Sequence, residues 1–162
     1  MFKSTKTYGH NLGFSCAFRQ WKADSHCKYI HGYSLQFKFV FAARDLDIRH
    51  WAVDFGSMRS LKGTLEDTFD HTTLIAQDDP ERDTFLELQR KGLIQLRILP
   101  AVGCEAFAYY VAQVAQSWLA DNGYAPRVNL VSVEVSEHGA NSAIYEPDEY
   151  HEDQNPPFGA SA

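Results

Sequence analysis

Alternating side chains in residues 31–41 constrain the fold more strongly than any other stretch of this chain. Every second position from residue 35 onward is a large apolar residue, namely Leu35, Phe37, Phe39 and Phe41. This period-two pattern predicts a β-strand with one buried face, over 35–43. Residues two apart on a strand point the same way, so His31 and Tyr33 are predicted to face one site, and Gly32 lets another group approach the backbone closely.

A cysteine four residues before His31 adds a thiol to this site. Cys27, His31 and Tyr33 would then bring a thiol, an imidazole and a phenol together where a loop enters the sheet. One interpretation is a functional site. The other is a half-buried strand start with an incidental cysteine, and these residues alone leave both open.

Composition limits the classes of protein to consider. The chain has 162 residues, which suggests one domain, and its net charge of −6 argues against a nucleic-acid-binding surface. Its three cysteines form no C-x-x-C pair and no disulfide framework, which indicates a reducing, cytoplasmic location. No apolar run approaches membrane-spanning length, so no membrane partner is expected.

The remaining periodicities predict an α+β fold, an antiparallel sheet with two main helices on one face. Strands are predicted at 8–18, 93–99, 127–137 and 143–145, and helices at 54–69, 80–91 and 104–122. The strand at 8–18 would place Phe18 in the core. Residues 1–146 form the predicted domain, followed by an acidic, proline-containing tail at 147–162.

Two features beside these elements have alternative interpretations. Asp70 and His71 follow a predicted helix, where they would either close a turn or pair a carboxylate with an imidazole for proton transfer. The loop before Cys27 carries a basic rim that is either solvated or binds anions. The rim consists of Arg19, Lys22, His26 and Lys28.

Two glutamates are candidate binding residues. Glu137 ends an otherwise apolar strand face, where a carboxylate needs water or a partner. Glu105 lies in the first turn of the predicted helix 104–122, where it also complements the helix dipole.

Five short blocks, in order, resemble the 6-pyruvoyl- and 6-carboxy-tetrahydropterin synthase family, whose pattern begins F-x-A-A-H and continues C-x-x-x-H-G-H. The blocks are Phe14-Ser15-Cys16-Ala17-Phe18, Cys27-x-x-x-His31-Gly32-Tyr33, Val53-Asp54-Phe55-Gly56, Phe69-Asp70-His71 with Leu74, and Glu137 eight residues before Tyr145. The resemblance implies the tunnelling fold (T-fold), in which subunits join their sheets into a barrel. It also implies a homo-oligomer, a trimer or a hexamer, with active sites between subunits.

The resemblance further implies a small-molecule pterin substrate, 7,8-dihydroneopterin triphosphate, and a product with a pyruvoyl or carboxy side chain. By residue matching, Cys27 is the general base, Asp70 and His71 are the proton-relay pair, and Glu137 anchors the pterin ring. A carboxylate suits that role because the pterin N3–H and 2-amino groups are parallel donors. Glu105 matches a residue at the mouth of the pocket.

The metal site is where this chain departs from the family. The three zinc-binding histidines of the family fall on Phe18, His31 and Tyr33, and only His31 is a histidine here. A catalytic zinc takes about three protein ligands, so zinc is expected to be substoichiometric. Three hypotheses remain: a synthase with an altered zinc site, a non-catalytic pterin- or purine-binding protein, and metal-free side-chain cleavage of a related dihydropterin.

Overall fold

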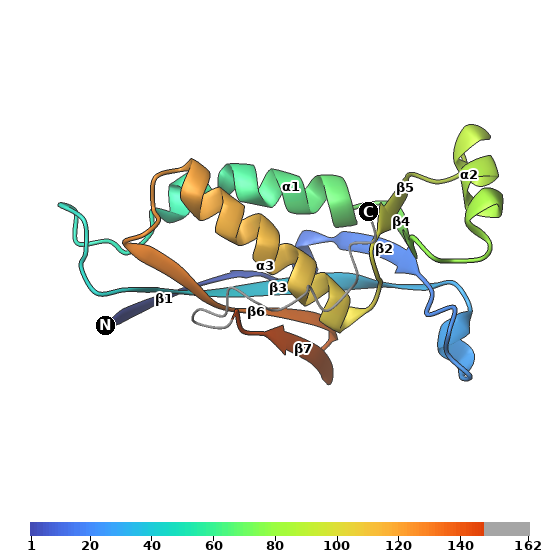
Figure 1. Ribbon diagram of the computed structural model, residues 1–162, viewed down its shortest axis with the longest axis horizontal. Coiled ribbons are helices and arrows are strands. Elements are labelled where there is room, and N and C mark those ends of the chain that lie inside the picture. The colour runs from blue at the N-terminus through green and yellow to red at the C-terminus, as the bar shows by residue number, and fades with distance from the viewer. Residues whose placement is uncertain (148–162) are drawn as a thin grey trace.

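The structure is a computed structural model that describes residues 1–147, and these form a seven-stranded sheet with helices on one face (Figure 1). The strands are β1 (Phe2–Tyr8), β2 (Phe14–Phe18), β3 (His31–Ala43), β4 (Thr72–Ala76), β5 (Leu96–Leu99), β6 (Val128–His138) and β7 (Asn141–Tyr145). The helices are α1 (Arg59–Phe69), α2 (Arg82–Arg90) and α3 (Cys104–Asp121). The strand order is β5-β4-β2-β3-β6-β7, with β1 also paired to β3.

The long strand β3 organises the sheet. Its first residues pair with β2, while the rest pair with β1 on the same edge and with β6 on the other. The predicted buried face is confirmed, because Leu35, Phe37, Phe39 and Phe41 are all 0% exposed. The strand begins at His31, so both His31 and Tyr33 belong to it.

Aromatic contacts join this buried face to α1 and α3, which both lie over it (Figure 1). The ring centres of Phe37 and Phe69 lie 4.9 Å apart, and those of Phe69 and Phe107 lie 5.3 Å apart. Burial of one such side chain stabilises the fold by about 1.5–3 kcal/mol. The α+β class is therefore confirmed, with α2 set apart at one end of the sheet.

Two details differ from the sequence-based prediction. The sheet is mixed rather than wholly antiparallel, because β4 runs parallel to both β2 and β5. The predicted strand at 8–18 is broken by a 3-10 turn at His10–Leu12, which ends at Gly13 with φ of 77°. The chain keeps its direction there: β1 and β2 are both antiparallel to β3 and become separate strands, one after the other, along the same edge of it.

Within residues 1–147, no helix is long and apolar enough to cross a bilayer. The predicted tail at 147–162 lies outside the described residues except for residue 147.

Candidate active site

Phe18, His31 and Tyr33 meet at the end of β2 and the start of β3. Phe18 and His31 are direct partners in the β2–β3 register. Their ring centres lie 5.1 Å apart, those of His31 and Tyr33 lie 5.6 Å apart, and those of Phe18 and Tyr33 lie 6.2 Å apart. Three imidazoles on one tetrahedral zinc, with Zn–N near 2.1 Å, would hold their ring centres at about 5 Å. The three rings therefore pack against one another at ordinary aromatic contact distances, which are similar to that spacing.

The side chains at these positions do not fit zinc. Phe18 is 2% exposed and has no donor atom. Burial raises the pKa of the Tyr33 phenol, so it resists becoming a phenolate ligand. His31 Nδ1 donates to the Tyr29 carbonyl oxygen at 2.7 Å, which leaves only Nε2 as an acceptor. Within the described part of one chain, no group of three or more His, Cys, Asp or Glu side chains is placed to hold a metal ion.

Cys27 lies beside this aromatic cluster, in a 3-10 turn of residues His26–Lys28. Ser25 Oγ accepts a hydrogen bond from the Cys27 N–H at 3.3 Å, and the Cys27 carbonyl oxygen accepts one from the Gln20 N–H at 2.9 Å. Besides burial, the proximity of Glu137, Cys27 and Cys104 also raises the pKa of Tyr33. The base and the pterin anchor inferred from the sequence thus act electrostatically on one phenol.

Glu137 interacts with Cys104, the first residue of α3. Burial, and to a smaller extent the nearby carboxylates Glu137 and Glu105, raise the pKa of Cys104 to about 12. The thiol is therefore protonated at neutral pH and forms hydrogen bonds with Glu137, including its carboxylate. Cys104 acts as a hydrogen-bond partner of Glu137 and not as a nucleophile, while Glu105 is exposed at the same helix end.

Asp70 and His71 form a close pair between α1 and β4. His71 Nδ1 lies 2.6 Å from Asp70 Oδ1, and the His71 side chain is 81% exposed. The His71 backbone adopts φ of 55°, a left-handed conformation that is unfavourable for a residue with a Cβ. Its N–H donates to the Ser15 carbonyl oxygen at 2.7 Å, which fixes the pair against β2.

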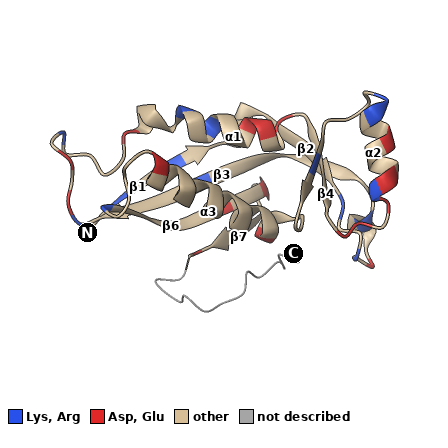
Figure 2. Ribbon diagram, turned by 45° about the horizontal axis from the view of Figure 1, so that its top comes forward, with Lys and Arg blue, Asp and Glu red and all other residues tan. Residues whose placement is uncertain are grey.

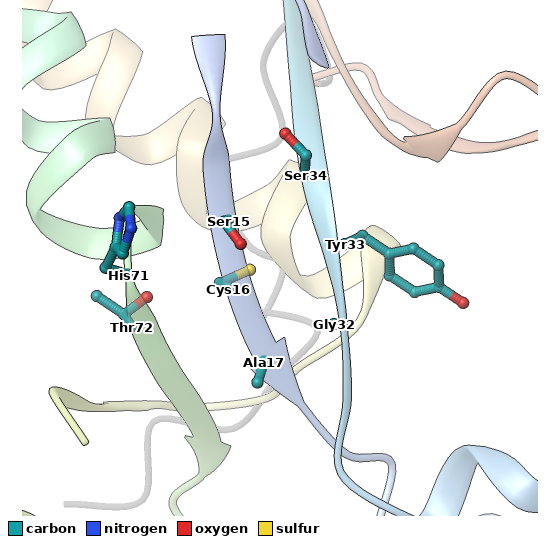
Figure 3. A pocket seen from close by; sticks show the side chains of 8 residues that line it. All are labelled: Ser15, Cys16, Ala17, Gly32, Tyr33, Ser34, His71 and Thr72. Atoms are coloured by element: carbon teal, nitrogen blue, oxygen red, sulfur yellow. The ribbon is translucent and has the colours of Figure 1, made fainter. Parts of the chain in front are cut away.

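One chain does not bring the Asp70–His71 pair to Cys27. His71 lines an open cavity of about 460 Å³ with residues of the other sheet face, among them Ser15, Ala17, Gly32 and Ser34. Figure 3 shows β2 and β3 between His71 and the Tyr33 ring, which points away from the cavity. The His71 N–H donates to the carbonyl oxygen of Ser15 within β2, whereas the Cys27 carbonyl oxygen accepts from the N–H of Gln20, which follows the end of β2.

Two further residues at the site were not assigned a role from the sequence. The His138 ring lies 5.8 Å from the Tyr33 ring, on the residue after Glu137. The contact of Cys104 with Glu137 joins α3 to β6, two elements that are distant in sequence. In the sequence, the position of His138 next to Glu137 could have indicated that it lies at the site. No local sequence pattern indicates a contact of Cys104 with Glu137.

The family model and the curated relatives that this chain matches are all tetrahydropterin synthases. Residues 9–148 match the family described as 6-pyruvoyl tetrahydropterin synthase. The chain is 32% identical over 82 residues to a 6-carboxy-5,6,7,8-tetrahydropterin synthase of Rickettsia bellii, covering 50% of this chain and 56% of that protein. It is 27% identical over 88 residues to the corresponding protein of Rickettsia conorii, covering 54% and 61%. The matched region thus spans little more than half the length of these curated relatives.

Solved structures confirm the predicted tunnelling fold. An uncharacterized protein of Wolinella succinogenes superposes with a TM-score of 0.77 at 18% identity, covering 91% of this chain and 98% of that one. The 6-pyruvoyl tetrahydropterin synthase of Plasmodium vivax gives a TM-score of 0.64 at 11% identity, covering 91% and 99%. At these identities the likeness concerns the fold alone.

Proposed function

Because this chain belongs to the 6-pyruvoyl tetrahydropterin synthase family, we propose that it is a lyase acting on the side chain of a dihydropterin. The observation that carries the proposal is the Asp70–His71 pair. Its 2.6 Å contact is formed on an 81% exposed imidazole, and the left-handed φ of 55° at His71 costs free energy. The hydrogen bond from the His71 N–H to the Ser15 carbonyl oxygen holds this conformation, and it leaves the imidazole exposed beside Asp70, where it could transfer a proton.

The pterin ring is proposed to bind at Glu137. Its carboxylate would accept from the pterin N3–H and 2-amino groups, while the protonated Cys104 thiol holds it from the helix side. Glu105 is proposed to lie at the rim of the same pocket. Cys27, next to Tyr33, would take a proton from the substrate side chain.

The proposed chemistry proceeds through proton transfers by this chain's own residues. Zinc in the family would supply a Lewis acid at the substrate oxygens, and Phe18 and Tyr33 do not fit that metal. In its place His31 Nε2 and the Tyr33 hydroxyl offer hydrogen-bonding groups. We propose that these two groups orient the side-chain hydroxyls of the substrate.

The separation of Cys27 from His71 supports a site completed by two copies of the chain. In one chain His71 lines a cavity from which the ring of Tyr33, a residue near Cys27, points away (Figure 3). A neighbouring subunit would supply its Asp70–His71 pair to Cys27. We propose a homo-oligomer, a trimer or a hexamer, in the cytoplasm.

Product analysis by mass tests the lyase proposal. Wild-type protein incubated with 7,8-dihydroneopterin or its triphosphate should change the pterin side chain, while Cys27→Ala should bind the pterin and return it intact. If wild type and Cys27→Ala both return only intact pterin, with or without added zinc, the protein is not a lyase. Persistent binding would then favour the second candidate, a non-catalytic pterin-binding protein, which the loss of a ligand at Phe18 supports.

A further inference from the structure

The main chain of Gln20 holds the turn that carries Cys27. Gln20 follows the end of β2, and its N–H donates to the Cys27 carbonyl oxygen at 2.9 Å. Its own carbonyl oxygen accepts from the Ala23 N–H at the same distance. Both main-chain groups of Gln20 are thus bonded within the loop that joins β2 to β3, so the position of Gln20 fixes that of the Cys27 turn.

The side chain of Gln20 reaches a segment 82 residues away. Gln20 Nε2 donates to the carbonyl oxygen of Val102, a buried residue. The next residue, Gly103, has φ of 112°, and a Cβ there would overlap the amide nitrogen of Gln20. Glycine therefore lets the two segments meet this closely.

This contact links the proposed base to the proposed pterin anchor. Gly103 leads directly into α3, whose first residue, Cys104, is hydrogen-bonded to Glu137. A continuous path of contacts then runs from Cys27 through Gln20 to the start of α3 and on to Glu137. All of these contacts lie within one chain, so they do not depend on a neighbouring subunit.

Ion pairs hold the residues on either side of Gln20 against the β4–α2 loop. Arg19 Nε lies 2.9 Å from Asp79 Oδ2, and Arg19 Nη2 lies 2.5 Å from Asp79 Oδ1, on a carboxylate that is 0% exposed. Lys22 Nζ lies 2.6 Å from Asp78 Oδ2. Figure 2 shows basic and acidic residues interspersed at this end of the molecule, around α2. The bidentate pair in particular fixes the chain beside Gln20.

From these contacts we infer that Gln20 is a positioning residue, which sets where Cys27 stands relative to a pterin bound at Glu137. The inference rests on the proposed function, because that supplies the roles of Cys27 and Glu137. A general base must lie within hydrogen-bond reach of the proton that it takes. A displacement of about 1 Å can lower the rate by up to about 100-fold, so the side-chain bond of Gln20 should affect turnover.

Gln20→Met tests this role, since it keeps the length of the side chain and the main-chain N–H but removes the donor to Val102. Turnover of 7,8-dihydroneopterin triphosphate should fall about tenfold. The pterin dissociation constant should stay within about twofold of the wild-type value, because Glu137 is unchanged. Gln89→Met is the matched control: it also loses a side-chain bond to the main chain, from the Leu96 N–H at 3.0 Å, and should leave both quantities unchanged.

Labelling with iodoacetamide tests the position of Cys27 independently of turnover. Cys27 is half-buried, whereas Cys16 and Cys104 are buried, and peptide mapping by mass separates the three. Gln20→Met should raise the labelling rate of Cys27 by about two- to tenfold, the effect of one lost hydrogen bond on local opening. Wild-type labelling rates at the two buried cysteines would show that the variant is folded, and Gln89→Met should label like wild type.

With an active wild type, the inference requires both slower turnover and faster Cys27 labelling in Gln20→Met, and either change without the other would overturn it. Equal effects of Gln20→Met and Gln89→Met would overturn it as well, as would weaker pterin binding in Gln20→Met. If wild type returns only intact pterin, the lyase proposal fails and labelling decides alone. Faster labelling confined to Gln20→Met would then still show that Gln20 holds the Cys27 turn, whereas unchanged labelling would refute both.

Discussion

Phe18 and Tyr33 occupy two of the three positions at which the family pattern F-x-A-A-H and C-x-x-x-H-G-H has histidine. The ring centres of Phe18, His31 and Tyr33 lie between 5.1 and 6.2 Å apart, so histidines at positions 18 and 33 would lie beside His31. Phe18 and Tyr33 lack the imidazole nitrogens that a zinc ion binds.

Restoring the donors should restore the metal. Protein purified without added zinc should contain well under one zinc per chain, and Phe18→His with Tyr33→His should bring it near one, measured by elemental analysis after dialysis. Because Phe18 is buried, a melting curve must show that the double variant folds, and Tyr33→His alone should give an intermediate content. One zinc per wild-type chain that survives mild chelation would mean that other ligands exist.

Glu137→Gln should weaken pterin binding. The substitution keeps the size of the side chain but replaces one acceptor oxygen with a donor that faces the pterin's own donors. A charge-assisted hydrogen bond of this kind contributes about 1.5–3 kcal/mol, so the dissociation constant should rise by roughly 10- to 100-fold, as measured by fluorescence titration.

Glu134→Gln serves as the control for that variant. Glu134 lies on the same strand, three residues away, and is within 3.8 Å of Lys38. Lys38 alternates with the buried residues Phe37 and Phe39, so Glu134 lies on the face away from the helices, whereas Glu137 lies near Cys104 of α3. Pterin affinity should therefore not change. Equal affinity in wild type and Glu137→Gln would remove Glu137 from the binding site.

Contacts of the site between residues that are close in sequence could be predicted, and contacts between residues that are distant in sequence could not. Strand parity alone placed His31 beside Tyr33, and their rings lie 5.6 Å apart. The contact of Cys104 with Glu137 depends on how the start of α3 meets the end of β6, which no local pattern encodes. The pairing of Arg19 with Asp79, 60 residues apart, was hidden for the same reason.

At the scale of elements, the errors lie where alternation is absent or misleading. β4 has five residues that are all buried, as is typical of a parallel strand inside a sheet, so no period-two signal marks it. The alternation over 8–18 continued through a 3-10 turn, because side chains of a turn can keep the same polarity pattern as a strand. The helices 54–69 and 104–122 were placed well, since their apolar residues recur at helical spacing over several turns.

The buried thiols of Cys16 on β2 and Cys104 on α3 predict that the stability of the fold falls at alkaline pH. Burial raises the pKa of both Cys16 and Cys104 from 9.0 to about 12. The native state therefore favours the neutral thiols, and their contribution to stability is complete below pH 9 and is lost as the pH rises toward 12. The free energy of unfolding should fall by roughly 1 kcal/mol per thiol between pH 8 and pH 10.

Urea denaturation at the two pH values measures this loss. Cys16→Ala should show a smaller fall than wild type, and comparing the two pH values within each protein removes the constant cost of the cavity. Tyr8, whose pKa burial also raises to about 12, is present in both proteins and contributes equally. An identical fall in wild type and Cys16→Ala would show that the Cys16 thiol does not titrate as described.

At the scale of the whole molecule, one chain does not bring the two halves of the proposed site together. Cys27 and Glu137 both lie near the Tyr33 phenol, whereas His71 opens into a cavity from which the Tyr33 ring points away (Figure 3). If the active site joins two copies of the chain, each copy contributes one half to each of two neighbouring sites.

This arrangement predicts complementation between inactive variants. Cys27→Ala and His71→Ala should each lose turnover, whereas a co-expressed mixture should recover it. In a random oligomer half of the chains supply an intact thiol and half supply an intact imidazole, so roughly a quarter of the sites are complete. Turnover, measured by product mass, should approach that fraction of the wild-type rate, and light scattering of the mixed sample should show a trimer or a hexamer.

A second mixture separates complementation from partial activity of a single variant. Cys27→Ala combined with the double variant Cys27→Ala/His71→Ala contains no thiol at any site and should stay inactive. Recovery only when one chain keeps Cys27 and another keeps His71 requires that the two groups meet across a subunit boundary. A mixture no more active than its parents, in an oligomer of normal size, would show that Cys27 and His71 do not form one site.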